Sequence, residues 1–306
     1  MSTAFVFPGQ GSHRAGALGS WTDHPAAAVL DDVSDGVGRD VVSLSEDETA
    51  GGRTADAQPA ILAASLVPWR ALVDAGVRAD VVAGHSLGEY TAAIAAGAVG
   101  VRDGAALVAE RGAAMGEACA RNPGTLTAVV KLDPDAVDAL LADLDEVVLA
   151  NDNAPGQVVL GGPHEAIAEV RDRARAAGGR ALPLDVEGAF HTPAMAPAVP
   201  RIEAALDAVT LRDADVPLVA GATARESRDA AVIAEGLASG VLSPVRWREV
   251  QLRLADLGVT TLVEVGPGGV LGGLARRTVP HLTVHTVASP DDLDAVVEAL
   301  VGESSG

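Results

Sequence analysis

The sequence predicts an α/β protein with a parallel sheet covered by helices and a second, smaller unit inserted into it. Short apolar segments alternate with longer helical segments at both ends of the chain, an alternation typical of parallel sheets. Residues 122–188 interrupt this alternation with the order β-α-β-β-α-β, which is the ferredoxin-like pattern. We therefore expect residues 1–121 and 189–306 to form a large domain and residues 122–188 a ferredoxin-like subdomain.

The first part of the large domain is built from short buried strands, each followed by a helix. Residues 4–7 predict a strand that runs into a glycine turn, and residues 56–75 predict a helix with a kink or junction at Pro68. The segment "ADVVAGHS" at 79–86 predicts the next strand. Two alanine-rich helices are expected after it, at 87–99 and 102–119.

The inserted unit follows, and then the alternation resumes. An acidic cap and Pro134 in the first turn favour a helix that begins near residue 133. A turn is expected at 153–156 between two of the strands. In chain order, we expect strands and helices of the insert at 126–132, 133–144, 146–152, 156–162, 163–178 and 180–186. Later strands are expected within 216–222 and 260–265, with a helix start after the second.

Composition limits the classes of partner and the compartment. The formal net charge is −20, with 42 acidic and 22 basic residues, so a polyanion such as DNA is repelled and no nucleic-acid partner is expected. The single cysteine, Cys119, excludes an internal disulfide and fits a reducing compartment. The chain starts without a signal-peptide pattern and no apolar run is long enough for a membrane span. We expect a cytoplasmic protein with no membrane partner.

The segment "GHSLG" at 84–88 has the spacing of a nucleophile elbow. In a Gly-x-Ser-x-Gly elbow the serine sits on a sharp strand-to-helix turn, where side chains at the glycine positions would collide with neighbouring backbone. The strand before this motif and the helix after it supply that context and indicate an α/β-hydrolase-like arrangement of the large domain. The alternative is a glycine-rich turn with an incidental serine.

A serine nucleophile needs a base, and the chain has seven histidines. His85 is adjacent to Ser86 and is expected to point away from it on the elbow. His191 lies in "GAFHTPAM", where the inserted unit returns to the large domain, and domain junctions often form clefts. The alternative for His191 is a packing role.

Five segments together resemble the malonyl-CoA:acyl-carrier-protein transacylases, the acyltransferases of fatty acid and polyketide synthesis. The resemblance covers roughly residues 4–288, and any one of the segments alone would be weak evidence. The five occur in the order and spacing of that family: "FPGQGS" at 7–12, "GHSLGE" at 84–89, "ERG" at 110–112, "FHTPAM" at 190–195 and "EVGPGGVL" at 264–271.

The resemblance implies roles for the residues that match these motifs. Ser86 would take the acyl group, and His191 would activate it and later protonate the departing thiolate. The backbone N–H groups of Gln10 and Leu87 would form the oxyanion hole. In this family a backbone carbonyl orients the histidine, and the matching residue here is Gly240.

The resemblance also implies that Arg111 holds the free carboxylate of a malonyl group and that Gln58 lines the site. The chemistry supports this role for Arg111, because a guanidinium can grip a carboxylate through two parallel charge-assisted hydrogen bonds. The alternative is a surface arginine that pairs with Glu110 or Glu117.

Two further residues concern the choice of acyl group. In polyketide acyltransferases a Phe before the catalytic His accompanies malonyl selection, and this chain has Phe190 there. One methyl group changes selectivity by only about 1–3 kcal/mol, so this is a preference. The family often has His two residues before that Phe, and this chain has Gly188, which we expect to enlarge the acyl pocket.

The expected function is malonyl transfer from malonyl-CoA to the thiol of an acyl carrier protein, by a monomer with no metal and no bound cofactor. A basic face for an acidic carrier would come from arginines, with these candidates: Arg246, Arg248, Arg253, Arg276 and Arg277. A thioester hydrolase with the same elbow, an acyltransferase for a different acyl group, and a non-catalytic scaffold are the alternatives.

Overall fold

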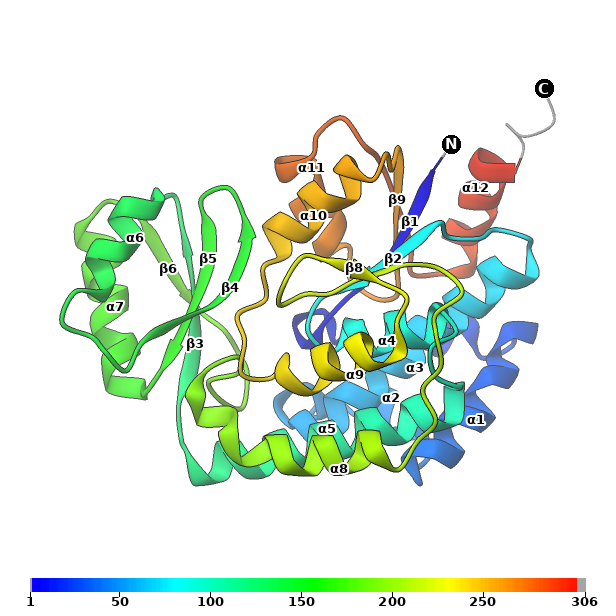
Figure 1. Ribbon diagram of the computed structural model, residues 1–306, viewed down its shortest axis with the longest axis horizontal. Helices are drawn as coiled ribbons and strands as arrows, with labels where there is room; N and C mark the ends of the chain where they lie inside the picture. Colours follow the sequence, from blue (N-terminus) through cyan, green and yellow to red (C-terminus); the bar gives the residue numbers. More distant parts are fainter. Residues whose placement is uncertain (1, 302–306) are drawn as a thin grey trace.

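The computed structural model of the chain describes residues 2–301, within which the strands form one large and one small sheet (Figure 1). The large sheet has the order β10-β9-β1-β2-β7-β8, with these bounds: Thr283–Val287, Thr261–Val265, Thr3–Phe7, Val81–Gly84, Leu218–Val219 and Glu226–Ser227. The first five of these strands are parallel, and β8 is antiparallel at the edge. Every residue of β1, β2 and β9 is buried, as expected for strands covered on both faces.

Helices cover both faces of the large sheet. The α-helices of this part are α1 Val29–Val37, α2 Val41–Glu46, α3 Thr54–Asp74, α4 Gly88–Ala95, α5 Val101–Arg121, α8 Val199–Asp207, α9 Ala230–Ser239, α10 Trp247–Asp256, α11 Val270–Thr278 and α12 Pro290–Val301. Short 3-10 helices lie at Gln10–Ser12, Gly19–Trp21, Pro25–Ala28, Ala50–Gly52 and Pro193–Ala198. The alternation of β1 side chains divides the core, because Phe5 and Phe7 face one side and Ala4 and Val6 the other.

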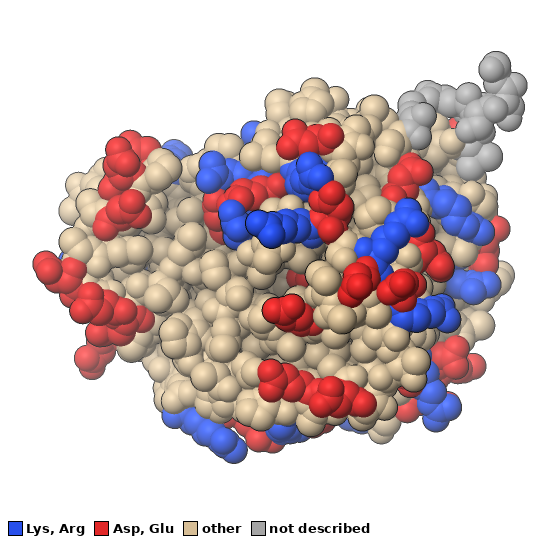
Figure 2. All heavy atoms as spheres, viewed as in Figure 1, with Lys and Arg blue, Asp and Glu red and all other residues tan. Residues whose placement is uncertain are grey.

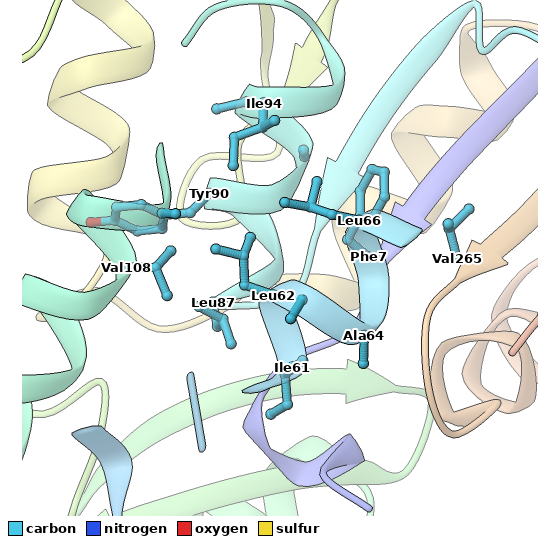
Figure 3. Close-up of a cluster of buried hydrophobic side chains, with 14 of the residues drawn as sticks. Phe7, Ile61, Leu62, Ala64, Leu66, Leu87, Tyr90, Ile94, Val108 and Val265 are labelled. Carbon is cyan, nitrogen blue, oxygen red and sulfur yellow. The ribbon is translucent and has the colours of Figure 1, made fainter. Parts of the chain in front are cut away.

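The larger part of the core lies between the sheet and helices α3, α4 and α5. Figure 3 shows Leu62 and Leu66 of α3 among Phe7, Leu87 and Ile94, which come from β1, the turn after β2, and α4. The core on the other face is formed by α10 and α11 against the alternate residues of the central strands. The carboxyl ends of β1 and β2, where ligands of parallel sheets bind, are therefore held rigidly.

The small sheet is antiparallel and has the order β4-β5-β3-β6. Its elements are β3 Thr125–Val130, α6 Pro134–Leu141, β4 Val148–Ala154, β5 Gln157–Gly162, α7 His164–Ala176 and β6 Arg180–Pro183. Helices α6 and α7 lie on its outer face (Figure 1), where Val129 and Leu160 pack against Ile167 and Val170. Alternate residues such as Leu126 belong to the core shared with the large sheet.

A backbone bridge joins the small sheet to the segment before α10. The Val245 N–H donates to the Ala150 carbonyl at 2.9 Å, and the Asp152 N–H donates to the Val245 carbonyl at 2.9 Å. A parallel bridge therefore pairs Asn151 with Val245. This contact fixes the small sheet beside the carboxyl ends of the large one.

Most of the expected elements are confirmed, and two details differ. Helix α3 continues through Pro59 and Pro68, so Pro68 is not a junction; burial of nearly the whole helix in the core offsets the lost N–H groups. Strand β4 extends to Ala154, which shortens the expected turn, and Gly156 takes its positive φ of 67°. Asp133 caps α6 as expected, since its side chain accepts the Ala136 N–H. None of the helices within residues 2–301 has the length and apolar character that crossing a bilayer requires.

Candidate active site

Ser86 stands on a sharp turn between β2 and α4. Its φ of 56° lies in the left-handed region, which costs energy for a residue other than glycine and is common at functional turns. Glycine is required on both sides of it. A Cβ on Gly84 would lie 1.9 Å from the Gly88 carbonyl carbon, and a Cβ on Gly88 would lie 2.0 Å from the Phe7 oxygen. The incidental-turn alternative does not explain this packing, which exposes one hydroxyl at the end of the sheet.

His191 reaches Ser86 from the segment that follows the small sheet. Its Nε2 lies 2.8 Å from Ser86 Oγ. Its Nδ1 lies 2.8 Å from the Gly240 carbonyl and 3.1 Å from the Ser243 carbonyl. Because two carbonyl oxygens can only accept, Nδ1 carries the proton and Nε2 is left as the acceptor for the serine hydroxyl.

Burial keeps this imidazole neutral. Desolvation, together with the positive charge of Arg111, lowers the pKa of His191 from 6.5 to about 3, although the Gly240 carbonyl opposes the shift. His191 also has a positive φ of 59°, so both members of the pair are held in strained backbone. A neutral imidazole hydrogen-bonded to a hydroxyl is the arrangement needed for general-base catalysis.

Arg111 projects from α5 to the same hydroxyl. Only 2% of it is exposed, and its Nη2 donates to Ser86 Oγ at 3.1 Å. The surface alternative is wrong, because Glu110 and Glu117 pair instead with Arg201 of α8. The guanidinium carbon lies 5.3 Å from the centre of the Tyr90 ring, at cation–π distance. A buried cation thus sits beside the nucleophile.

Gln58 of α3 fixes the orientation of Arg111. Its Oε1 accepts from Arg111 Nη1 at 2.7 Å, and its Nε2 lies 3.4 Å from Met115 Sδ. This leaves Arg111 Nε without a partner within residues 2–301. The buried guanidinium therefore keeps one N–H without a partner among the described residues, and Arg111 lines a small cavity together with Ser86 and His191.

The two backbone N–H groups expected to form an oxyanion hole are available. In the part of the chain that the structure describes, neither the Gln10 N–H nor the Leu87 N–H donates a hydrogen bond. Gln10 lines the cavity beside Ser86, while its side chain turns toward Thr54, with Nε2 3.4 Å from the hydroxyl oxygen. Leu87 precedes the first residue of α4, where the helix dipole favours negative charge.

A cavity of about 550 Å³ opens at Ser86 between the two sheets. Gln10, Ser86 and His191 line it from the large sheet's side, and Leu126 and Val159 line it from the small sheet. Both the position and the volume fit an acyl group with an extended thiol-bearing arm.

The two residues expected to select the acyl group differ in their relation to the cavity. Phe190 lines it and is 5% exposed. Gly188 does not line it: a Cβ at this position would lie 2.3 Å from Cys119 Sγ, so the neighbouring space is filled by the cysteine. The expectation that Gly188 enlarges the acyl pocket is therefore wrong, and this glycine is needed for packing.

His85 points away from Ser86, as expected. Its Nε2 lies 2.9 Å from Asn153 Oδ1, and its ring packs edge-on against Trp247 with centres 5.5 Å apart. Burial lowers the pKa of His85, which keeps it neutral. His85 is a link between the elbow and the small sheet, and motif reasoning had no signal for Asn153.

The five arginines expected to form a basic face are largely engaged. Their partners are Glu249 for Arg246, Asp152 for Arg248, Glu226 for Arg253, the Val284 carbonyl for Arg276, and Gln157 with the Pro155 carbonyl for Arg277. Carboxylates neutralise the charges of Arg246, Arg248 and Arg253, so these three residues do not form a free cationic surface. The expected basic face for a carrier protein is therefore reduced to Arg276 and Arg277. On the face in Figure 2, basic and acidic side chains are interleaved over the upper middle of the molecule, and acidic side chains predominate at the left, over the small sheet and its helices.

Comparison with known proteins gives consistent matches over nearly the full chain. Residues 4–303 match the acyl transferase domain family. The malonyl CoA-acyl carrier protein transacylase of Bacillus subtilis is 36% identical over 311 residues, which covers 98% of each protein.

Solved structures agree. The acyl-carrier-protein S-malonyltransferase of Burkholderia pseudomallei superposes with a TM-score of 0.91 at 37% identity, covering 97% of this chain and 100% of that one. A malonyl-transacylase solved in complex with a type II PKS acyl-carrier protein gives a TM-score of 0.93 at 33% identity, covering 98% and 100%.

Proposed function

The chain belongs to the acyl transferase family, and on this premise we propose that it moves a malonyl group from malonyl-CoA to the phosphopantetheine thiol of an acyl carrier protein. One observation carries the proposal: Ser86 Oγ lies within hydrogen-bond distance of both His191 Nε2, at 2.8 Å, and Arg111 Nη2, at 3.1 Å. A general base and a carboxylate-binding cation thus meet at one nucleophile.

In the first half-reaction Ser86 attacks the thioester carbonyl while His191 Nε2 takes the hydroxyl proton. The tetrahedral oxyanion accepts hydrogen bonds from the Gln10 and Leu87 N–H groups. The carbon–sulfur bond then breaks, and the departing thiolate takes the proton from His191. The products are a malonyl ester of Ser86 and free coenzyme A.

In the second half-reaction the carrier thiol replaces coenzyme A in the cavity. His191 takes the thiol proton, the thiolate attacks the ester, and the proton passes to Ser86 as the serine leaves. The Gly240 and Ser243 carbonyls hold the imidazole during both steps, because they stabilise the Nδ1 proton of the imidazolium. No bound cofactor is needed for this exchange.

The choice of malonyl over acetyl is assigned to Arg111. Its remaining N–H groups pair with the malonyl carboxylate, and the Gln58 amide oxygen, which accepts from Arg111 Nη1, holds the guanidinium in position. Phe190 lines the cavity beside His191, and its ring would take up space that an α-methyl group needs, which favours the unbranched acyl group.

We also infer that the chain divides as its element order indicates, into an α/β-hydrolase-like large domain of residues 1–121 and 189–306 and a ferredoxin-like subdomain of residues 122–188. The antiparallel order β4-β5-β3-β6, with both helices on one face, supports the second assignment. We propose a monomer in the cytoplasm, since a net charge of −20 opposes self-association and the one cysteine is buried and free. Light scattering would test the monomer.

The acceptor distinguishes this function from hydrolysis. Purified protein is incubated with malonyl-CoA, with and without a phosphopantetheine-bearing carrier, and malonyl-carrier and free malonate are quantified. We expect malonyl-carrier to form much faster than malonate is released. Release of malonate at the same rate without a carrier would instead identify a thioester hydrolase.

A further inference from the structure

A second, small cavity of about 10 Å³ touches Ser86. It is lined by Glu89 and Tyr90 of α4, Arg111 of α5, His191, and the segments around Gly221 and Gly236. Glu89 is 6% exposed, and no step of the proposed reaction uses it. A buried carboxyl group three residues after the nucleophile therefore needs an explanation.

Glu89 and Arg111 are the charged side chains that line this cavity, and they do not form a close ion pair within the described residues. Glu89 Oε2 accepts the Gly221 N–H at 3.1 Å. The partners of Arg111 are neutral: the Gln58 amide, the Ser86 hydroxyl and the face of Tyr90. Because an uncompensated buried charge is unfavourable, each of the two charged groups lowers the cost of the other.

Binding of a malonyl group adds a second negative charge to the pair formed by Glu89 and Arg111. This inference rests on the proposed function, which places the malonyl carboxylate against Arg111. Two carboxylates would then share one guanidinium in a buried site, and like charges at short range disfavour ionisation of both. We infer that Glu89 is the resident counter-charge of Arg111 and that its carboxylate form takes up a proton when the malonyl carboxylate enters. The proton comes from solvent and returns to it when the malonyl group leaves.

Among the ionisable groups around this cavity, Glu89 is the one whose protonation changes near neutral pH. Burial raises the pKa of Tyr90 to about 12 and lowers the pKa of His191 to about 3, so both are neutral. Burial also keeps His85, on the turn from β2, neutral by lowering its pKa. The segments around Gly221 and Gly236 bring no ionisable side chain to the cavity lining.

Glu89 itself has a pKa raised to about 7 by burial, against the opposing effects of the Gly221 N–H and Arg111. A second negative charge raises it further. The protonated form of Glu89 therefore favours malonyl binding. Malonyl-CoA should bind more tightly as the pH falls through about 7 and more weakly as it rises above that value.

The first test is the KM for malonyl-CoA in the loading half-reaction from about pH 6 to pH 8.5. For wild type we expect KM to rise about three- to tenfold across this range, since one unit of pKa difference corresponds to tenfold. In Glu89→Gln the KM should stay low and flat, with little change in kcat. The matched control is Glu264→Gln, which removes another buried carboxylate with a raised pKa, on β9 and outside both cavity linings. It should keep the wild-type rise.

The second test needs no variant and decides the matter if Glu89→Gln does not fold. Proton uptake is followed with an indicator dye in weak buffer near pH 7 as wild type is mixed with malonyl-CoA. Acylation itself releases no proton, because the coenzyme A thiol leaves protonated at this pH. We expect uptake of a fraction of a proton per site with malonyl-CoA and none with acetyl-CoA.

The failures are distinguishable. If malonyl-CoA does not acylate Ser86, the proposed function fails. If Ser86 is acylated but no proton is taken up, or if Glu89→Gln keeps the wild-type rise in KM, the role of Glu89 is wrong and the acyltransfer stands.

Discussion

Replacing Arg111 by alanine should remove the malonyl preference while leaving the acylation machinery in place. The size of the effect follows from the donors of the guanidinium. Nη1 is committed to Gln58, Nη2 lies 3.1 Å from Ser86 Oγ, and Nε has no partner among the described residues. These bonds use two of the five guanidinium N–H groups, so three remain, and a carboxylate can accept from two of them.

Each hydrogen bond to a charged group contributes about 1.5–3 kcal/mol. Loss of a single bond then lowers kcat/KM for malonyl-CoA by roughly ten- to a hundredfold, and loss of two lowers it further. Acetyl-CoA has no carboxylate, so its kcat/KM should not fall. The malonyl-to-acetyl ratio should drop by the same factor.

The assay measures acyl-enzyme formation by intact-protein mass spectrometry, with malonyl-CoA and acetyl-CoA in parallel. Arg201→Ala is the matched control, since it removes an arginine that pairs with Glu110 and Glu117 on the outer surface of α5. The control should keep the wild-type ratio. An unchanged ratio in Arg111→Ala would refute the assignment of the carboxylate to this guanidinium.

Three further predictions concern strain, packing and pH. Ser86→Gly should be more stable than Ser86→Ala by about 1 kcal/mol in denaturant unfolding, since only glycine relieves the φ of 56°; equal stabilities would argue against strain. Gly188→Ala should lower the free energy of unfolding by about 1–3 kcal/mol, because its Cβ would lie 2.3 Å from Cys119 Sγ. Adding Cys119→Ala to this variant should restore much of the lost stability, and neither change should alter acyl selectivity. With the pKa of His191 lowered from 6.5 to about 3, kcat of loading should stay level from about pH 7.5 to pH 5, and stability should fall as the pH drops below about 6.5 because the unfolded imidazole binds protons first. A kcat halved near pH 6.5 would indicate an ordinary imidazole.

The sequence predicted the sharp turn at Ser86 because a short local motif specifies it. The glycine at 84 is required by a local contact with Gly88, whereas the glycine at 88 is required by a contact with Phe7 of β1, which is far away in the sequence. His191 and Arg111 were found through the resemblance, since no local pattern relates them to Ser86. The alternation of strands and helices in the sequence was sufficient to predict the positions of the central strands β1, β2 and β9.

The rest depends on contacts between distant parts of the chain. The Gly240 carbonyl lies at the C-terminal cap of helix α9, and the helix is held by the Tyr90 hydroxyl, which donates to the Leu237 carbonyl at 2.9 Å across 147 residues. Gly188 was misjudged because its neighbour Cys119 lies on α5, far away in the sequence. The surface arginines were misjudged for the same reason, since the partners of Arg248 and Arg253 lie far away in sequence.

The most direct measurement of the central claim is the mass of the intact protein after brief exposure to malonyl-CoA, followed by mapping of the modified peptide. We expect one malonyl adduct, located on Ser86, absent in Ser86→Ala and strongly reduced in His191→Ala. An adduct that persists in Ser86→Ala, or that maps to a different side chain, would contradict the claim that these groups act together.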